Sequence, residues 1–261
     1  MSETRRTGTQ SLERAALLLR EIATRGRFGW RLKDLAERCQ LDRATTYRLL
    51  QGLVRERLIR QRDSDRHYLP GPLLFELGLS VPDHSEFQAA CRAPLTRLSK
   101  RFASLSAAFL RSGAEFVCAG RAGQSVYVGT VLEVGTRRPL ITTAGGVAIL
   151  IAMPPEESRQ LAAQNLKQLS VMGPAVTRRL ESFLRRSEGL GYAYNRSETT
   201  AGVHSFGVPI RDAGQRVFAS IVVSGHAEEF PAERVPEVVA ALREEAGKLE
   251  REVRRIELQA A

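Results

Sequence analysis

The segment LDRATTYRLLQGL, residues 41–53, gives one predicted helix two different faces. Asp42 offers a side-chain oxygen that can cap the first turn of this helix. Positions 46, 49, 50 and 53 hold Thr or Leu at the spacing of a stripe that faces a core. The other face is small, polar and basic, and consists of Arg43, Ala44, Thr45, Tyr47, Arg48 and Gln51. We therefore expect a helix that packs on one side and is open to a partner on the other.

Two further helices are predicted before this segment. The first helix begins at Ser11, carries an apolar stripe and ends at Gly26. The second helix covers residues 32–39. The short gap before the third helix leaves room only for a tight turn. Two helices joined in this way, the second with a basic front, are typical of a helix-turn-helix that reads the major groove of DNA. The small side chains of Ala44 and Thr45 let the helix backbone approach the bases. Arg43 and Arg48 can reach phosphates or base edges.

A hairpin is predicted directly after the third helix. Residues 58–61 and 67–69 have the composition of two short strands around the turn 63–65. Such a hairpin would form a wing, with Arg62 and Arg66 over the flanking backbone or the minor groove of DNA. The alternative is a solvated hairpin without a role. Its place behind the third helix favours the wing.

The chain after the hairpin predicts a linker helix and then a sheet domain. Pro70 and Pro72 mark the start of a helix over residues 72–90, which is too apolar for a free linker and should pack on a partner chain or on the second domain. Strands, then helices, then strands follow, an order that predicts an α+β fold. Expected helices cover 94–102, 145–153, 155–164, 174–189 and the chain from 231, and expected strands cover 104–110, 115–120, 125–131, 203–210 and 217–224.

Length and charge fit a two-domain protein that binds nucleic acid. A chain of 261 residues suits two domains, and its net charge of +10 favours a polyanionic partner. Residues 1–80 hold 16 Lys and Arg against 10 Asp and Glu, so the charge is densest around the predicted helix-turn-helix. Arg-rich codon usage is an alternative explanation, so charge alone does not decide the function. RNA is disfavoured because Tyr47 is the only aromatic residue on the predicted reading face.

No catalytic, metal-binding or membrane pattern accompanies these features. The phosphate-loop, HExxH and GxSxG patterns are missing, so we expect no enzyme activity and no cofactor. Cys39, Cys91 and Cys118 are widely spaced and fit reduced, apolar residues better than disulfides or metal ligands. The apolar run 147–153 is far shorter than the roughly 20 residues of a membrane helix. We expect a cytoplasmic protein without a membrane partner.

Five stretches of the chain together carry a resemblance to a known family. They are SLERAALLLREIA (11–23), LKDLAERCQLDRATTYRLLQGLVRERLI (32–59), YLPGPLLFELG (68–78), RRPLITTAGGVAILIAMPPEE (137–157) and GVHSFGVPIRDAGQRVFASIVVSG (202–225). In this order they resemble the opening helix, the helix-turn-helix, the wing end with its linker helix, and two effector-domain blocks of the IclR-type bacterial transcriptional regulators. The helix-turn-helix alone would also suit other winged-helix groups, whereas the combination is specific.

The resemblance implies a domain organisation and a function. We expect a disordered tail (1–9), a winged helix-turn-helix (10–71), a linker helix (72–90) and a GAF-like effector-binding domain with a mixed or antiparallel sheet (91–261). The implied protein is a ligand-responsive regulator that binds a double-stranded DNA operator as a homodimer or homotetramer. In the alternative, the large domain only oligomerises and binds no ligand.

The family's effector pocket can be carried onto this sequence. The matching positions are Arg138, Ala144, Gly145, Asn195, Val203, Ser205, Val222 and Ser224. The alternation of side chains along a strand independently puts Val203 with Ser205, and Val222 with Ser224, on one face.

Two positions depart from the family pattern, and two arginines suggest a ligand class. Val147 stands where members often have Lys, so any role of that Lys is lost. Thr46 replaces a frequent Val, and its hydroxyl needs a partner such as a carbonyl of the preceding turn.

Arg137 and Arg138 beside the implied pocket favour an anionic effector, such as a small organic or aromatic carboxylate. The alternative is two surface arginines on a loop.

Overall fold

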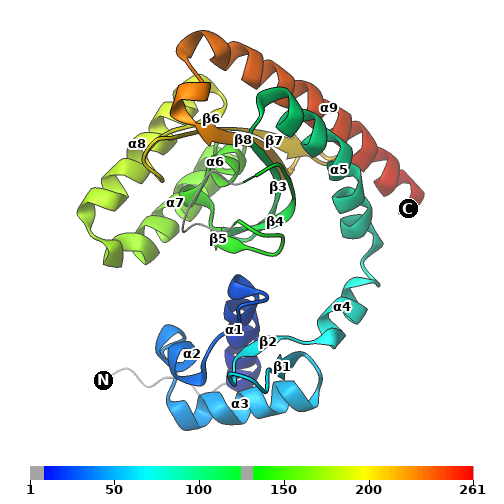
Figure 1. Cartoon of the computed structure of the whole chain (residues 1–261), viewed down its shortest axis with the longest axis vertical. Helices are drawn as coiled ribbons and strands as arrows, with labels where there is room; N and C mark the ends of the chain where they lie inside the picture. The colour runs from blue at the N-terminus through cyan, green and yellow to red at the C-terminus, as the bar shows by residue number, and fades with distance from the viewer. Residues whose placement is uncertain (1–8, 125–131, 261) are drawn as a thin grey trace. The chain divides into compact units, whose positions relative to one another are not determined.

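Two compact units, Met1–Pro82 and Asp83–Ala261, make up the chain (Figure 1). The computed structural model describes residues 9–124 and 132–260. The strand expected over 125–131 therefore lies outside the described residues, as does almost all of the expected tail.

The first unit is a helix-turn-helix followed by a hairpin. Its helices are α1 (Gln10–Arg25), α2 (Leu32–Arg38) and α3 (Arg43–Arg55), and its hairpin pairs β1 (Ile59–Gln61) with β2 (Tyr68–Pro70). The helices and the hairpin share one core, in which Leu18, Ile22, Leu35 and Leu50 are fully buried. The expected winged helix-turn-helix is confirmed.

The two-faced character of α3 is confirmed at its first turn. The Asp42 carboxylate accepts a hydrogen bond from the Thr45 N–H at 2.8 Å and so caps the helix. The hydroxyl of the fully buried Thr46 donates to the Asp42 carbonyl at 2.9 Å, the type of partner expected for it. Leu50 and Leu53 continue the buried stripe, which fixes the rotation of α3 and the direction of its polar face.

The expected single linker helix is wrong, because the structure has two helices there. α4 (Pro72–Gly78) ends before Pro82, and α5 (Pro82–Phe102) begins at that proline. Proline lacks the N–H that a residue in the first turn of a helix does not need, so Pro82 fits the start of a new helix. α5 then runs past residue 91, so that position is not a break between elements.

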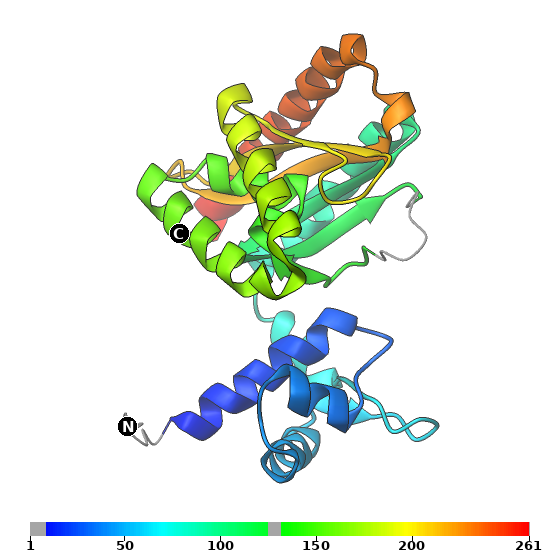
Figure 2. The same ribbon diagram turned by 90° about the vertical axis from the view of Figure 1, so that its left-hand side faces the viewer.

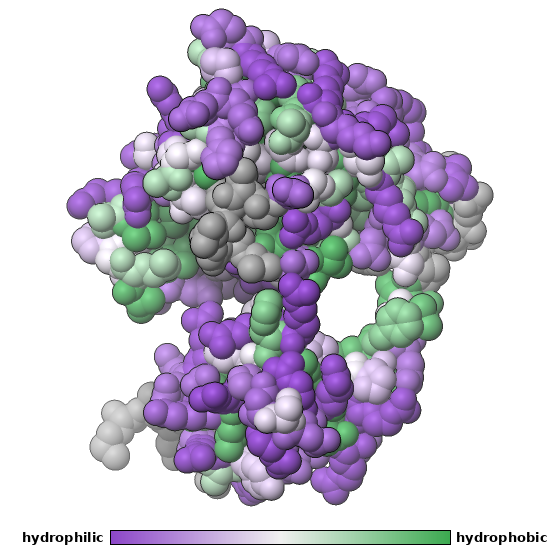
Figure 3. All heavy atoms as spheres, in the orientation of Figure 1, coloured by the Kyte–Doolittle hydropathy of each residue, from purple (hydrophilic) through white to green (hydrophobic). Residues whose placement is uncertain are grey.

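Apolar side chains are exposed on α4 and just after it. Figure 3 shows hydrophobic residues gathered on the surface over this segment. Phe75 is 71% exposed, and Leu77, Leu79 and Val81 are exposed as well. Such a cluster is unusual for a surface that stays in water.

A six-stranded antiparallel sheet forms the centre of the second unit. Its strands lie in the order β5-β4-β3-β8-β7-β6. They are β3 (Leu105–Ser112), β4 (Glu115–Ala122), β5 (Arg137–Pro139), β6 (Ala193–Arg196), β7 (Val203–Arg211) and β8 (Val217–His226). The edge strands β5 and β6 were not expected, because three or four residues give no clear alternation of polar and apolar side chains.

Helices cover both faces of this sheet (Figure 2). α5 and α9 (Val235–Ala260) share a core with Phe206 and Val208 of β7. On the opposite face, α6 (Ala144–Ile151), α7 (Pro155–Leu169) and α8 (Pro174–Leu190) pack with Phe109 and Val222. Short 3-10 turns, η1 (Leu140–Thr142), η2 (Ser170–Met172), η3 (Ala227–Glu229) and η4 (Ala232–Arg234), join the elements. The α+β class is confirmed, with an antiparallel sheet.

Glycines let α6 lie directly on its neighbours. A Cβ atom at Gly207 would lie 2.5 Å from the carbonyl oxygen of Ala144, and one at Gly145 would collide with the Phe109 ring. A Cβ atom at Gly146 would collide with the Leu140 carbonyl. Because these neighbours belong to packed backbone or a buried ring, they have little room to move. The first turn of α6 is therefore held against the sheet.

Gly146→Ala should lower the free energy of unfolding of the second unit by about 1–3 kcal/mol, because the new methyl group overpacks this contact. Gly189→Ala in α8 is the matched control. Nothing lies within 4 Å of its added methyl group, so it should raise the free energy of unfolding by about 0.5–1 kcal/mol. Urea unfolding of the full-length variants measures both, and equal effects would contradict the tight packing of α6.

Candidate functional site

The polar face of α3 is open. Arg43, Ala44 and Arg48 are exposed, and Tyr47 is 50% exposed although it is aromatic. Two further predicted residues, Thr45 and Gln51, are half-buried at the border of the core-facing stripe. The face thus offers two guanidinium groups, one phenol and a small side chain to a partner.

Two arginines of the wing differ in their surroundings. Arg62 donates to Asp65 at 2.6 Å and to the carbonyls of Arg27 and Phe28, each at 3.1 Å. Its guanidinium therefore fastens the hairpin to the α1–α2 connection, and a contact of Arg62 with DNA stays a prediction. Arg66 is exposed and has a φ of 59° in the turn.

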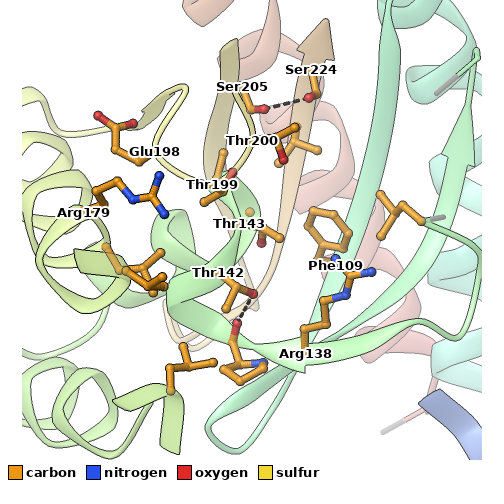
Figure 4. A pocket seen from close by; sticks show the side chains of 18 of the residues that line it. Phe109, Arg138, Thr142, Thr143, Arg179, Glu198, Thr199, Thr200, Ser205 and Ser224 are labelled. Carbon is orange, nitrogen blue, oxygen red and sulfur yellow. Dashed lines mark hydrogen bonds between the residues drawn. The ribbon is translucent and has the colours of Figure 1, made fainter. Parts of the chain in front are cut away.

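A cavity of about 410 Å³ opens on the α6–α8 face of the second unit (Figure 4). Residues of β3, β7 and β8 form its floor, β5 and the start of α6 form one wall, and α8 with residues 198–200 forms another. Phe109, Val222 and Leu180 are among its apolar residues. This volume lies in the range of about 300–1,000 Å³ that is usual for small-molecule sites.

The structure brings six of the eight predicted effector residues to this cavity. They are Arg138, Ala144, Gly145, Ser205, Val222 and Ser224. Asn195 and Val203 do not line it, which corrects that part of the prediction. Asn195 is buried and accepts a hydrogen bond from the Thr199 N–H at 3.1 Å, so it shapes the wall from behind. The carbonyl of the buried Val203 accepts from the Ser197 N–H at 2.9 Å at the start of β7.

The neighbouring arginines of β5 separate into different environments. Arg137 donates to the Glu115 carboxylate at 2.6 Å and to the Ser112 hydroxyl at 2.7 Å, and it does not line the cavity. Arg138 lines the cavity, and burial lowers the pKa of its guanidinium. Within the described residues, the guanidinium of Arg138 has no hydrogen-bond or ion-pair partner. The expected pair of ligand-facing arginines is thus reduced to Arg138.

Polar groups from the backbone and from two strands accompany Arg138. Thr143 caps α6 by accepting from the Gly146 N–H at 3.1 Å, and the first residues of α6 face the cavity. N–H groups in a first helical turn lack carbonyl partners within the helix and favour an anion. On the floor, the hydroxyls of Ser205 and Ser224 lie 2.7 Å apart. The cavity can therefore hold an anionic group and orient a polar one.

Several lining residues were missed from the sequence. α8 and the turn before it contribute Met172, Val176 and Arg179, and Thr199 comes from the loop after β6. These segments show only the periodicity of a covering helix or the composition of a loop. Their approach to the sheet is a result of tertiary packing, which no local spacing records.

Other chemistries find little support in the described ranges 9–124 and 132–260. No group of His, Cys, Asp and Glu there could hold a metal ion. All three cysteines are free and buried, and burial raises the pKa of Cys91 to about 12. None of the helices in these ranges is long and apolar enough to cross a membrane.

Comparison with known proteins gives matches along nearly the whole chain. Residues 11–63 match the IclR helix-turn-helix domain, and residues 80–251 match the family described as bacterial transcriptional regulator IclR C-terminal. The glycerol operon regulatory protein of Streptomyces griseus is 30% identical over 251 residues, which cover 94% of this chain and 96% of that protein.

Solved structures share the fold at lower identity. A protein of Silicibacter sp. TM1040, described as an IclR transcriptional regulator, has a TM-score of 0.76 at 22% identity, covering 94% of this chain and 96% of that one. An IclR homologue of Microbacterium hydrocarbonoxydans, complexed with 4-hydroxybenzoate, has a TM-score of 0.70 at 21% identity, covering 94% of this chain and 100% of that one.

Arg62→Ala should raise the pKa of Asp65, because the hydrogen bonds from Arg62 hold this pKa well below its usual range. A carboxyl with a lowered folded pKa stabilises the fold above its unfolded pKa and loses this effect as the pH falls. The wild type should therefore lose stability on acidification through this pair, and the variant should lose less, because the Asp65 carboxylate still accepts from the His67 N–H. Carboxyl-detected NMR titration measures the shift. Arg60→Ala is the control, and an unchanged Asp65 pKa in both variants would refute the assignment.

Proposed function

Because the chain belongs to the IclR family of bacterial transcriptional regulators, we propose that it is a ligand-responsive regulator with two binding sites. The first unit binds a double-stranded DNA operator through α3 and the wing. The cavity of the second unit binds a small organic or aromatic carboxylate. The observation that carries the ligand class is the desolvated guanidinium of Arg138 within that cavity, which no described residue pairs with.

In the proposed DNA complex, some exposed residues of α3 contact base edges and others contact phosphates. Arg43 begins the helix and Tyr47 lies one turn later, so both can reach base edges in the major groove. Arg48 grips a phosphate, and the small side chain of Ala44 lets the backbone approach. Arg66 at the wing adds a contact to the flanking backbone.

In the proposed effector complex, the carboxylate lies against Arg138 and the first turn of α6. A cationic fork and the positive N-terminal end of a helix both favour an anion there. The apolar residues hold the body of the ligand, and the Ser205 and Ser224 hydroxyls orient a polar substituent. The 4-hydroxybenzoate held by the Microbacterium hydrocarbonoxydans homologue has this combination of groups.

Regulation in this proposal requires a homodimer or homotetramer. A winged helix-turn-helix reads one half-site, so an operator with two half-sites needs at least two copies. The exposed apolar residues of α4 and the following turn are our candidate contact with a second copy. The ligand acts only if it binds more tightly to one of two arrangements of the copies, either competent or incompetent for DNA.

Substitutions on α3 test the reading face. Arg48→Ala should weaken binding to operator and nonspecific DNA alike, because it removes a phosphate contact. Arg43→Ala and Tyr47→Ala should instead change the base preference, by about 1–3 kcal/mol at the affected position. Fluorescence anisotropy on operator variants measures both, with Arg185→Ala in the second unit as a control for charge. Titrations equal to the wild type for all three α3 variants would overturn this assignment.

Arg138→Gln tests the effector site. The variant should bind carboxylates at least about tenfold more weakly and keep its DNA affinity, because Arg138 has no partner in the described structure that its loss would leave unsatisfied. Isothermal titration with 4-hydroxybenzoate and aliphatic acids measures the change. Arg137→Gln is the matched control on the same strand. If no acid in a wide panel binds the wild type or raises its melting temperature, the cavity is not an effector site and the second unit only assembles copies.

A further inference from the structure

A second arginine contributes to the cavity from the wall opposite β5. Arg179 of α8 lines the cavity, and Figure 4 shows its guanidinium extending toward the interior near Thr199. Arg138 reaches the same space from β5, beside Phe109. The next residue of α8, Arg178, is exposed and does not line the cavity.

The carboxylate of the cavity wall does not neutralise these arginines. Glu198 also lines the cavity, but one of its oxygens pairs with Arg186 at 2.6 Å and the other accepts from the Arg196 N–H at 2.5 Å. Its side chain is only 13% exposed. Neither Arg138 nor Arg179 has a hydrogen-bond or ion-pair partner among the residues that the structure describes. The lining therefore keeps two positive charges on separate walls.

From this arrangement we propose that the effector carries two anionic groups, one at each end of an apolar body. One group binds Arg138 and the other binds Arg179. This proposal deepens the proposed function of the same cavity and rests on it. It differs from a single carboxylate with a neutral remainder, for which Arg138 and the α6 N-terminus would be enough.

The surfaces between the arginines fit such a ligand. The Phe109 ring, Val222 and Leu180 offer an apolar path that suits a short hydrocarbon chain or a ring. Arg138 is the more buried of the two cations, whereas Arg179 is exposed. The inner anionic group should thus supply most of the affinity, because its partner is less screened by solvent. The outer group should supply selectivity.

The first test compares acids that differ only in the second charge. Isothermal titration of the full-length protein, at one fixed ionic strength, uses succinate, glutarate, adipate and pimelate. Each diacid is compared with the monoacid of the same carbon number, from butyrate to heptanoate. At least one diacid should bind about tenfold more tightly than its monoacid, the usual effect of one added charge-assisted hydrogen bond. 3-Phosphoglycerate in the same series shows whether phosphate or carboxylate suits the outer position.

The second test assigns the outer group to Arg179 by a double-mutant cycle between protein and ligand. Arg179→Ala should lower the affinity for the preferred dianion by about tenfold and change that for the matched monoanion by less than about twofold. Arg178→Ala removes the same charge from the next position and should leave both affinities unchanged. Circular dichroism and the melting temperature check that the variants are folded.

The outcomes separate this inference from the proposed function. Equal binding of diacids and monoacids, both weakened by Arg138→Gln, would overturn the dianion and leave the carboxylate site intact. Equal losses in Arg179→Ala and Arg178→Ala would also overturn it, because they would reveal only a long-range effect of net charge. Absence of binding by any of these acids to the wild type would overturn the inference together with the effector site on which it rests.

Discussion

The cavity of the second unit is largely apolar and is lined by the guanidinium of Arg138, which has no counter-ion among the described residues. Burial of such a charge is unfavourable until an anion or polar groups compensate it. The N-terminus of α6 lies at the same cavity and also favours an anion. It can lie there because glycines let this helix pack directly on the sheet. The neighbouring Arg137 is neutralised by Glu115 outside the cavity. The free charge is thus confined to the place where a ligand can enter.

In the first unit, core packing determines the orientation of one helix, α3. The buried stripe from Thr46 to Leu53 fixes the rotation of α3, and the Asp42 cap fixes its start. α5 begins where this unit ends, and Leu95 and Leu98 of this helix lie in the core of the second unit. At the surface, Arg97 donates to the Glu245 carboxylate of α9 at 3.0 and 2.6 Å. The two sites are therefore linked by the chain through a well-packed element, although linkage alone creates no coupling.

The fold was readable from the sequence wherever a local pattern is sufficient. The period of α3, its cap and the long strands β3, β7 and β8 all carry such patterns, and the family resemblance added six residues that line the cavity. The prediction of a single linker helix was wrong because the chain has a break between α4 and Pro82, a residue that favours the start of a helix. Arg179 was missed because its position relative to the sheet depends on how α8 packs. Arg137 was wrongly expected to face the ligand together with Arg138 because β5 was not predicted, and adjacent side chains on a strand point to opposite faces.

In the proposed function, the carboxylate site and the DNA site are coupled in one protein. Fluorescence anisotropy with operator DNA, repeated at rising concentrations of the acid that binds most tightly, measures this coupling. Isothermal titration of the same acid against free and DNA-bound protein measures it from the other side. We expect both affinities to change by the same factor, of about 5–150-fold. Tight binding of both ligands with affinities that do not depend on each other would contradict it.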